Sequence, residues 1–336
     1  MTPPAPVLTV TPNPALDTTY TVAELHPGLS HRVPAPIEKA GGKGLNVARV
    51  IQQSGFGVHA VLPVGGDSGV QLRTDLEDSG LPHSLVEVAQ PTRRSIAIYD
   101  RTAGTATLLN EEGRELTAGE WAALSAGVLR TLQHSGCLVG SGSLPLHGPE
   151  SFYADLVRHA RRLDIPAVID TSGPALLAAA RAGAMVLKPN HHELLEATGE
   201  TAMERGAEML LALGAGLVLV SRGEEGMYAF TSDDAGTSSW HARFPRVLSG
   251  NATGAGDAAV AAIAVLLAQG IRTVPDLVRA ATGWSASAVL MPTAGVLHAD
   301  YNLMTDAVVV RPGRVRPPTP PAGTAPAQRA KDSPWD

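Results

Sequence analysis

The 336-residue sequence predicts an α/β protein in which helices cover both faces of a central, mostly parallel β-sheet. From residue 117 onward, apolar runs of strand length alternate with longer helical patterns, which is typical of right-handed β–α–β crossovers. Three short strand-like segments at residues 84–88, 95–100 and 105–109 interrupt this alternation. They predict a second, small β-sheet outside the main one.

The elements of the main layers follow from local patterns. Strands are expected where short apolar runs end at turn residues, at residues 7–11, 58–64, 137–140, 167–170, 185–187 and 217–221. Helices are expected at residues 43–54, 67–78, 118–132, 149–163, 174–182 and 201–213. A further helix at residues 258–269 is apolar almost throughout but too short to span a bilayer, which predicts a buried helix.

Residues 1–310 are expected to form one domain. The irregular segment 12–36 and the strand-rich segment 84–112 would build a lid that covers a site and excludes water, with a plain edge hairpin as the alternative. Residues 311–336 are rich in Pro, Ala, Gly and Arg without apolar periodicity, which predicts a disordered tail.

Composition excludes several classes of partner. The net charge of −6 argues against nucleic acid. Residues 1–10 lack a basic region followed by an apolar core, so neither a signal peptide nor a membrane partner is expected. The single cysteine, Cys137, excludes an internal disulfide and a cysteine-based zinc site, and it favours the cytoplasm as the compartment.

The most informative segment is TGAGD at residues 253–257, immediately before the apolar helix. Backbone N–H groups at a helix start lack partners, and the helix dipole adds partial positive charge there. The amides of Gly254, Ala255 and Gly256 therefore form a candidate cradle for a phosphoryl group. Asp257 stands where a carboxylate would take a proton from an attacking hydroxyl. The combination predicts phosphoryl transfer to an alcohol.

A second glycine-rich segment, GGKGLN at residues 41–46, precedes the helix at 43–54. Lys43 supplies a cation, and Asn46 supplies a donor and an acceptor one turn later. The segment is not a Walker A loop, because Gly44 follows the lysine where Ser or Thr is needed. We interpret it as an anion site, with a tight turn before a helix as the alternative.

Other polar segments follow the expected strands, beyond whose carboxyl ends the ligands of parallel sheets bind. Asp17 would accept hydrogen bonds from sugar hydroxyls, although an Asx turn also explains its segment. Either Arg93 or Arg94 would bind phosphate, because neighbours on a strand face opposite sides; surface solvation explains the pair equally well. The segment GSGSLP at 140–145 does not match the G-x-S-x-G nucleophile elbow, and lines a pocket or turns the chain.

The segment KPNHHE at residues 188–193 follows another strand. Asn190 and Glu193 are three residues apart and would share a helix face aimed at a metal–phosphate cluster. Adjacent histidines diverge on a helix and no HExxH motif is present, so a zinc site is disfavoured. The segment SRGEEG at 221–226 is interpreted as a turn beside a nucleotide.

Taken together, these segments resemble the ribokinase-like carbohydrate kinases of the PfkB family over residues 6–300. The resemblance rests on an ordered series: an Asn-Pro-x-x-Asp start, GGKGxN, Thr-Arg, SGSLP, KPNxxE, SxGxxG and GAGD. TPNPALD, GGKGLNVA and Thr92-Arg93 are most similar to the branch that phosphorylates ketohexose phosphates. Two segments depart from the family, LHG at 146–148 in place of Pro-Pro-Gly, and residues 249–252; they weaken the choice of substrate more than the chemistry.

The resemblance implies a ribokinase-like three-layer α/β/α fold, ATP and Mg²⁺ as cofactors, and a set of roles. Asp257 would be the catalytic base, beside an anion hole of Gly254, Ala255 and Gly256. The sugar phosphate would be bound by Asp17, Gly42, Lys43, Asn46, Arg93, Arg32 and Ser143. ATP would be bound by Lys188, Asn190, Ser221, Gly223 and Gly226, and Mg²⁺ would be addressed by Glu193, directly or through water.

The same resemblance predicts ATP-dependent phosphorylation of a primary hydroxyl of a ketohexose phosphate. A ketohexofuranose carries a CH₂OH-type arm at C1 and at C6, so fructose 1-phosphate is preferred and the 6-phosphates of fructose and tagatose are alternatives. A non-catalytic sensor of sugar phosphates or nucleotides on the same fold is a second alternative. A Rossmann dehydrogenase is disfavoured, because no G-x-G-x-x-G follows the first strand. A homodimer formed through the lid is the expected assembly.

Overall fold

The computed structural model describes residues 4–233 and 236–313, which form two β-sheets and the helices around the larger one. The main sheet has the strand order β14-β13-β12-β11-β10-β9-β8-β1-β4-β5. Its strands are β1 (Val7–Val10), β4 (Val58–Val64), β5 (His83–Glu87), β8 (Cys137–Ser141), β9 (Ala167–Asp170), β10 (Val186–Leu187), β11 (Leu217–Ser221), β12 (Met227–Asp233), β13 (Gly236–Arg243) and β14 (Val309–Pro312).

Strands β5 through β11 of this order run parallel, and β12, β13 and β14 extend the sheet as antiparallel strands. Parallel neighbours need helical crossovers, which explains the alternation in the sequence. The carboxyl ends of the parallel strands therefore lie along one edge of the sheet, and the polar segments that follow them come together there.

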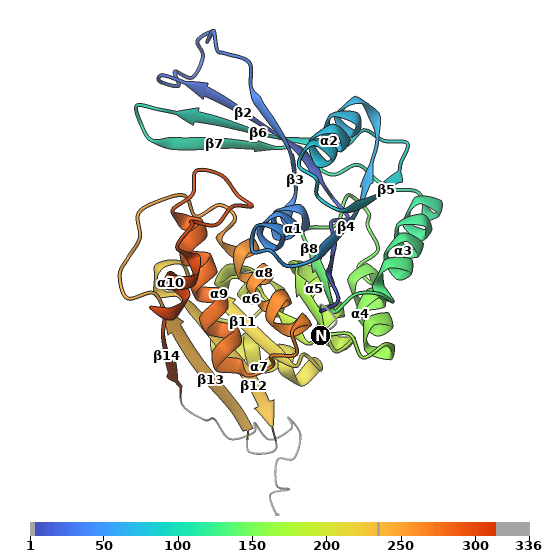
Figure 1. Cartoon of the computed structure of the whole chain (residues 1–336), viewed down its shortest axis with the longest axis vertical. Helices are drawn as coiled ribbons and strands as arrows, with labels where there is room; N and C mark the ends of the chain where they lie inside the picture. The colour runs from blue at the N-terminus through green and yellow to red at the C-terminus, as the bar shows by residue number, and fades with distance from the viewer. Residues whose placement is uncertain (1–3, 234–235, 314–336) are drawn as a thin grey trace, which may run out of the picture.

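Helices cover both faces of the main sheet, so the fold has three layers (Figure 1). One buried cluster contains side chains of α1 (Lys43–Gln53), α2 (Gly66–Asp78), α8 (Ala255–Ala268) and α9 (Val274–Val289). The other contains side chains of α3 (Ala118–Leu132), α4 (Phe152–Arg162), α5 (Gly173–Arg181), α6 (His191–Thr198) and α7 (Met203–Leu213). The short helix α10 (Tyr301–Asp306) packs on α9.

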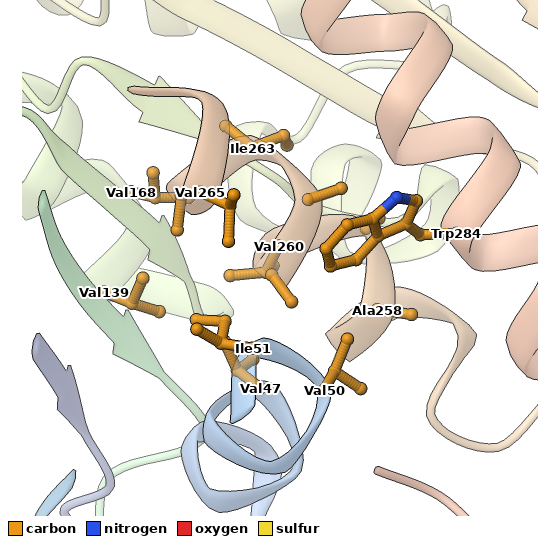
Figure 2. Close-up of a cluster of buried hydrophobic side chains, with 14 of the residues drawn as sticks. Val47, Val50, Ile51, Val139, Val168, Ala258, Val260, Ile263, Val265 and Trp284 are labelled. Carbon is orange, nitrogen blue, oxygen red and sulfur yellow. The ribbon is translucent and has the colours of Figure 1, made fainter. Parts of the chain in front are cut away.

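Helix α8 is apolar on all sides because other helices and the main sheet bury it on all sides. Figure 2 shows valine and isoleucine side chains of α1, β8 and β9 around α8, with Trp284 of α9 closing the cluster. A helix packed this tightly holds its first turn in a fixed position relative to the strand ends. That first turn carries Asp257.

The small sheet has the order β3-β2-β6-β7 and stands apart from the main body, joined to it beside α1 and α2 (Figure 1). Its strands are β2 (Ala15–Val22), β3 (Ile37–Gly41), β6 (Arg93–Asp100) and β7 (Thr105–Asn110). Strand β2 runs antiparallel to β3 and parallel to β6. Residue Gly42 then leads directly from β3 into α1.

The structure confirms the two sheets and the layers but corrects three boundaries of the predicted lid and tail. Residues 84–87 of the segment 84–88 lie in β5, which pairs with β4 in the main sheet. Residues 37–41, assigned to no strand by the sequence pattern, supply the edge strand β3. Arg311 and Pro312 belong to β14, paired with β13, because that pairing satisfies their backbone; the rest of the predicted tail, residues 314–336, lies outside the described residues.

Within the described ranges, none of the helices combines the length and the apolar character that a membrane span requires.

Candidate active site

Asp257 lies in the first turn of α8, and its side chain is buried with 6% of its surface exposed. Gly254 precedes the helix with φ 84°, a left-handed conformation that glycine adopts without strain. The Nδ2 group of Asn46 on α1 donates to Oδ2 of Asp257 over 2.8 Å. Burial raises the pKa of Asp257 to about 6, and the nearby Asp170 carboxylate adds to the rise. The carboxylate is thus held in place and is more basic than an ordinary aspartate.

The amides expected to form an anion hole, those of Gly254, Ala255 and Gly256, lie at the start of α8. The amide of Ala255 donates to the carbonyl of Ala252 over 3.2 Å, so it is already engaged and does not serve as a free donor. The amide of Gly256 makes no backbone hydrogen bond to any described residue outside the helix. A Cβ at Gly256 would lie 3.3 Å from Nζ of Lys188, so this glycine lets the ammonium approach the helix start. Of the three amides predicted to form the cradle, that of Ala255 is engaged, and Lys188 adds a cation beside Gly256.

A charge cluster centred on Asp170 lies at the end of β9. Asp170 is 1% exposed, and its carboxylate oxygens lie 3.5 Å from Nζ of Lys43 and 3.7 Å from Nζ of Lys188. Burial alone would raise the pKa of Asp170, but the ammonium groups of Lys188 and Lys43 outweigh it and hold that pKa below its ordinary value. Asp170 in turn raises the pKa of Lys43. Both lysines also lie close enough to Asp257 to oppose the rise of its pKa.

Lys43 also lies 3.6 Å from Oε1 of Glu193. The structure thus brings Lys43 together with the residues expected at the nucleotide end of the site. Asn190 and Glu193 form a capping box at the start of α6: Oδ1 of Asn190 accepts from the amide of Glu193, and Oε2 of Glu193 accepts from the amide of Asn190. One carboxylate oxygen of Glu193 therefore stabilises the helix start while the other faces the site.

The predicted nucleotide turn follows β11 directly. Ser221 forms an isolated parallel bridge with Asn190, so the turn at residues 221–226 lies beside the capping box. The 3₁₀ helix Gly223–Glu225 and Gly226 complete this turn. The segments containing Lys188, Asn190 and Ser221 therefore lie side by side at the ends of β10 and β11.

The predicted phosphate ligands Arg93 and Ser143 meet at Asn13. The Nε group of Arg93 donates to Oδ1 of Asn13 over 3.0 Å, and Nη2 donates to the Asn13 carbonyl over 3.3 Å. The Nδ2 group of Asn13 donates to Oγ of Ser143 over 3.2 Å. These three residues line a cavity of about 540 Å³ together with residues 110–113 and 144–146. The cavity is large enough for a sugar phosphate.

Asp17 lies in β2, and Gly42 lies between β3 and α1. A Cβ on Gly41 would come within 2.0 Å of Oδ2 of Asp17, so the carboxylate lies directly against the glycine backbone. Burial raises the pKa of Asp17 to about 6, opposed by Arg93, Lys39 and Arg49. Gly42 caps α1 with φ 115°. This position suits the recognition of sugar hydroxyls by Asp17.

The structure does not bring Arg32 to the site. Arg32 is exposed in the loop that joins β2 to β3, and it makes no hydrogen bond or ion pair to any described residue. Strand β2 has eight residues, which span roughly 26 Å away from its site-proximal end at Ala15. The loop therefore lies at the far end of the small sheet.

Two site residues escaped the sequence reasoning as functional groups, Asp170 and Asn13. Asp170 ends the predicted strand 167–170, and the rule that ligands bind beyond the carboxyl ends of parallel strands would have identified it. Asn13 stood in a recognised segment, but its bonds to Arg93 and Ser143 join residues 80 and 130 positions apart in sequence. No local pattern reveals such contacts.

The site carries two carboxylates that could contact a metal ion, those of Asp170 and Glu193. No cluster of three or more His, Cys, Asp or Glu side chains able to hold a metal ion occurs among residues 4–233 and 236–313. Oδ1 of Asp170 is buried without a hydrogen-bond partner, and Oε1 of Glu193 faces the site. One or two carboxylates beside a phosphate site suit Mg²⁺ that is held largely by the phosphates of a nucleotide.

Comparison with known proteins places this arrangement among related chains. Residues 13–296 match the sequence model of the pfkB family of carbohydrate kinases. A 1-phosphofructokinase of Xanthomonas campestris is 33% identical over 288 residues, covering 83% of this chain and 89% of that enzyme. The ATP-dependent 6-phosphofructokinase isozyme 2 of Mycobacterium tuberculosis is 30% identical over 298 residues, covering 88% of this chain and 87% of that enzyme.

Among solved structures, a tetrameric inhibited form of phosphofructokinase-2 from Escherichia coli superposes with a TM-score of 0.81 at 29% identity. The superposition covers 90% of this chain and 98% of that one. The residues that match the family include every strand of both sheets except β1 and β14, and all the site residues named above.

Proposed function

The chain belongs to the pfkB family of carbohydrate kinases, and on that premise we propose that it transfers the γ-phosphoryl group of ATP to a primary hydroxyl of a ketohexose phosphate. The preferred acceptor is fructose 1-phosphate, with fructose 1,6-bisphosphate as the product. The observation that carries this proposal is the buried Asp257 at the start of α8, bonded by Asn46 and flanked by Lys43 and Lys188.

In the proposed reaction, Asp257 accepts the proton of the sugar hydroxyl as the hydroxyl oxygen bonds to the γ-phosphorus and the bond from that phosphorus to the β–γ bridging oxygen breaks. Asn46 holds the carboxylate in one orientation through its hydrogen bond. The α8 start, Lys188 and Lys43 offset negative charge on the moving phosphoryl group. With a pKa of about 6, Asp257 is ionised at neutral pH and still basic enough to take the proton.

The two ends of the substrate would occupy different parts of the site. Arg93 and Ser143, held by Asn13, would bind the phosphate already on the sugar, and Asp17 would bind its hydroxyls. Lys188, Asn190 and the turn 221–226 would bind the phosphates and the rest of ATP. Mg²⁺ bound with ATP would be held by Glu193 and Asp170 and would neutralise phosphate charge. The cytoplasm, where ATP and sugar phosphates are made, is the proposed compartment.

Two relatives support different acceptors. The 1-phosphofructokinase relative shares 33% of its aligned residues with this chain, and the 6-phosphofructokinase relative shares 30%. The first favours fructose 1-phosphate, and the second keeps fructose 6-phosphate as the alternative. Both relatives support an acceptor of the proposed class, a ketohexose phosphate with one free primary hydroxyl.

The proposal is tested by coupled ADP release with ATP and Mg²⁺ and a panel of acceptors: fructose 1-phosphate, fructose 6-phosphate, tagatose 6-phosphate and the free sugars. We expect the highest kcat/KM with fructose 1-phosphate and little turnover of free sugars, because Arg93 would then lack its anion. A higher kcat/KM with a 6-phosphate would replace the proposed substrate. Binding of sugar phosphate without ADP release from any acceptor would indicate a sensor and refute the kinase.

We also propose that a second copy of the chain covers the small sheet. Its edge strand β7 is exposed along its length, with Leu108 at 53% and Leu109 at 54% exposure. Exposed leucines on an unpaired edge favour association, and the Escherichia coli structure is tetrameric. Light scattering after size exclusion should give a dimer or larger for the wild type and a smaller species for Leu108→Asp/Leu109→Asp. Leu303→Asp, which changes a leucine on α10 that is 69% exposed, should keep the wild-type mass. A wild-type mass of 34.7 kDa would refute this assembly.

A further inference from the structure

An ion pair between Arg49 of α1 and Asp75 of α2 lies where the two sheets join. Both side chains also bond the backbone of Ala40 in β3. The amide of Ala40 donates to Oδ2 of Asp75 over 2.9 Å, and Nη2 of Arg49 donates to the carbonyl of Ala40 over 3.3 Å. We call Arg49 and Asp75 the edge clamp.

The edge clamp bonds backbone groups of β3 that a further strand would otherwise bond. Strand β3 is outermost in the order β3-β2-β6-β7, so every second residue turns its backbone groups away from β2. Ala40 is opposite Leu16 in the register, and its N–H and C=O point to the clamp. The clamp thus satisfies both backbone groups of one residue at an otherwise open edge.

Helix α2 contacts β3 at a second point beside the clamp. The Nε2 group of Gln71 donates to Oε2 of Glu38 over 3.0 Å. Gln71 and Asp75 are four residues apart on one helix face, and Glu38 and Ala40 are two apart on one side of the strand. These matched spacings align the helix with the strand edge. The clamp lies at the more buried end of this contact, where the Arg49 side chain is 9% exposed.

The two residues after Ala40 connect the clamp to the active site. Gly41 lies against the carboxylate of Asp17, and Gly42 starts the helix that carries Lys43. We propose that the edge clamp positions the sugar-phosphate part of the active site by holding β3 against the main body. This inference rests on the proposed function, because it assigns Asp17 and its surroundings to the acceptor.

The expected kinetic effect depends on populations. Without the clamp, β3 and the Gly41–Gly42 junction adopt the binding arrangement only part of the time, and the apparent affinity falls by that fraction. Asp75→Ala removes the bond from the Ala40 amide and the ion pair that holds Arg49, and a loss of about 1.4 kcal/mol corresponds to a tenfold fall. We expect Asp75→Ala to raise KM for fructose 1-phosphate by about that factor, with kcat and KM for ATP nearly unchanged. Asp75→Asn keeps an oxygen for the Ala40 amide and should recover part of the loss.

The experiment measures these constants together with hydrogen exchange of the Ala40 amide, which should accelerate in Asp75→Ala whatever the substrate is. Asp75→Ala leaves Arg49 buried without its partner. The double variant Arg49→Met/Asp75→Leu avoids this, because it fills a similar volume with uncharged side chains. It also lacks the bonds to Ala40, so it should show the same KM and exchange changes. Arg73→Ala is the matched control, since Arg73 on α2 pairs with the exposed Glu87 and not with β3.

A folded Asp75→Ala or double variant with wild-type KM for the sugar phosphate would overturn the inference, and so would unchanged exchange at Ala40. An equal rise in KM for ATP would also overturn it, because it would indicate general loosening of the fold. Failure of the wild-type enzyme to turn over any sugar phosphate would count against the proposed function instead, and is measured separately.

Discussion

Asp257→Asn is expected to lower kcat with fructose 1-phosphate roughly a thousandfold, because an amide cannot accept the proton of the sugar hydroxyl. KM should change little, since Asn46 and the remaining site residues stay in place. The matched control is Asp276→Asn, which changes an exposed acid at the same position of the first turn of α9 and should keep wild-type kcat. Wild-type turnover in Asp257→Asn would exclude Asp257 as the base.

The stability of the same variant shows whether it has folded. Because the folded-state pKa of Asp257 lies above 3.8, at about 6, the folded protein binds this proton more readily than the unfolded chain. The ionised carboxylate therefore costs stability above pH 6. We expect urea unfolding at pH 8 to give Asp257→Asn a higher unfolding free energy, by up to about 3 kcal/mol, and the difference to shrink as the pH falls from 6 toward 3.8.

Asp17 has a pKa raised to about 6 as well, so the wild-type pH profile of kcat alone does not assign the base. Both carboxylates predict a fall of kcat below pH 6. In Asp257→Asn the residual kcat should no longer fall below pH 6. A profile that kept its full inflection would point to Asp17 as the base instead.

Asp170→Ala is expected to have the largest effect on stability, a loss of about 3–5 kcal/mol in unfolding free energy. The substitution leaves the ammonium of Lys188, which is 3% exposed, without its counter-charge. Among the described residues, Asp170 supplies the only carboxylate within 4.0 Å of Nζ of Lys188. Because the pKa of Asp170 is lowered in the folded state, its contribution is present above pH 3.8 and is lost as the pH falls through that lowered value.

The loss is measured by urea unfolding at pH 7 and has a specific rescue. Adding Lys188→Met removes the stranded charge, so the double variant should be more stable than Asp170→Ala alone. Asp155→Ala, which breaks an exposed ion pair with Arg158 on α4, is the control and should cost at most about 1 kcal/mol. Equal losses in Asp170→Ala and Asp155→Ala would show that the charge cluster does not stabilise the fold.

The sequence predicted those parts of the fold that local patterns determine. The helix 118–132 has a capping box at Thr117 and a regular apolar face, and its predicted bounds match α3. The turn before α8 was predictable because glycines, a carboxylate and an apolar run stand together. Strand β3 was not, because the residues IEKAG carry no alternating pattern and depend on β2, α1 and α2 for their conformation.

Long-range pairing explains the remaining differences. The segment 84–88 has strand character, but only its pairing with β4 places it in the main sheet. The charge cluster joins Lys43, Asp170 and Lys188 from three separate segments, so Lys43 could be identified as a cation without its partners being known. Arg32 was assigned by resemblance, and the length of β2 takes it away from the site.

The most direct test of the central claim is a crystal structure of Asp257→Asn with ATP, Mg²⁺ and fructose 1-phosphate bound, since this variant should bind its substrates without consuming them. The account predicts that the free primary hydroxyl lies between the side chain of residue 257 and the γ-phosphorus, within about 3 Å of the amide oxygen or nitrogen. A hydroxyl bound beside another residue, with the γ-phosphate away from the start of α8, would contradict it.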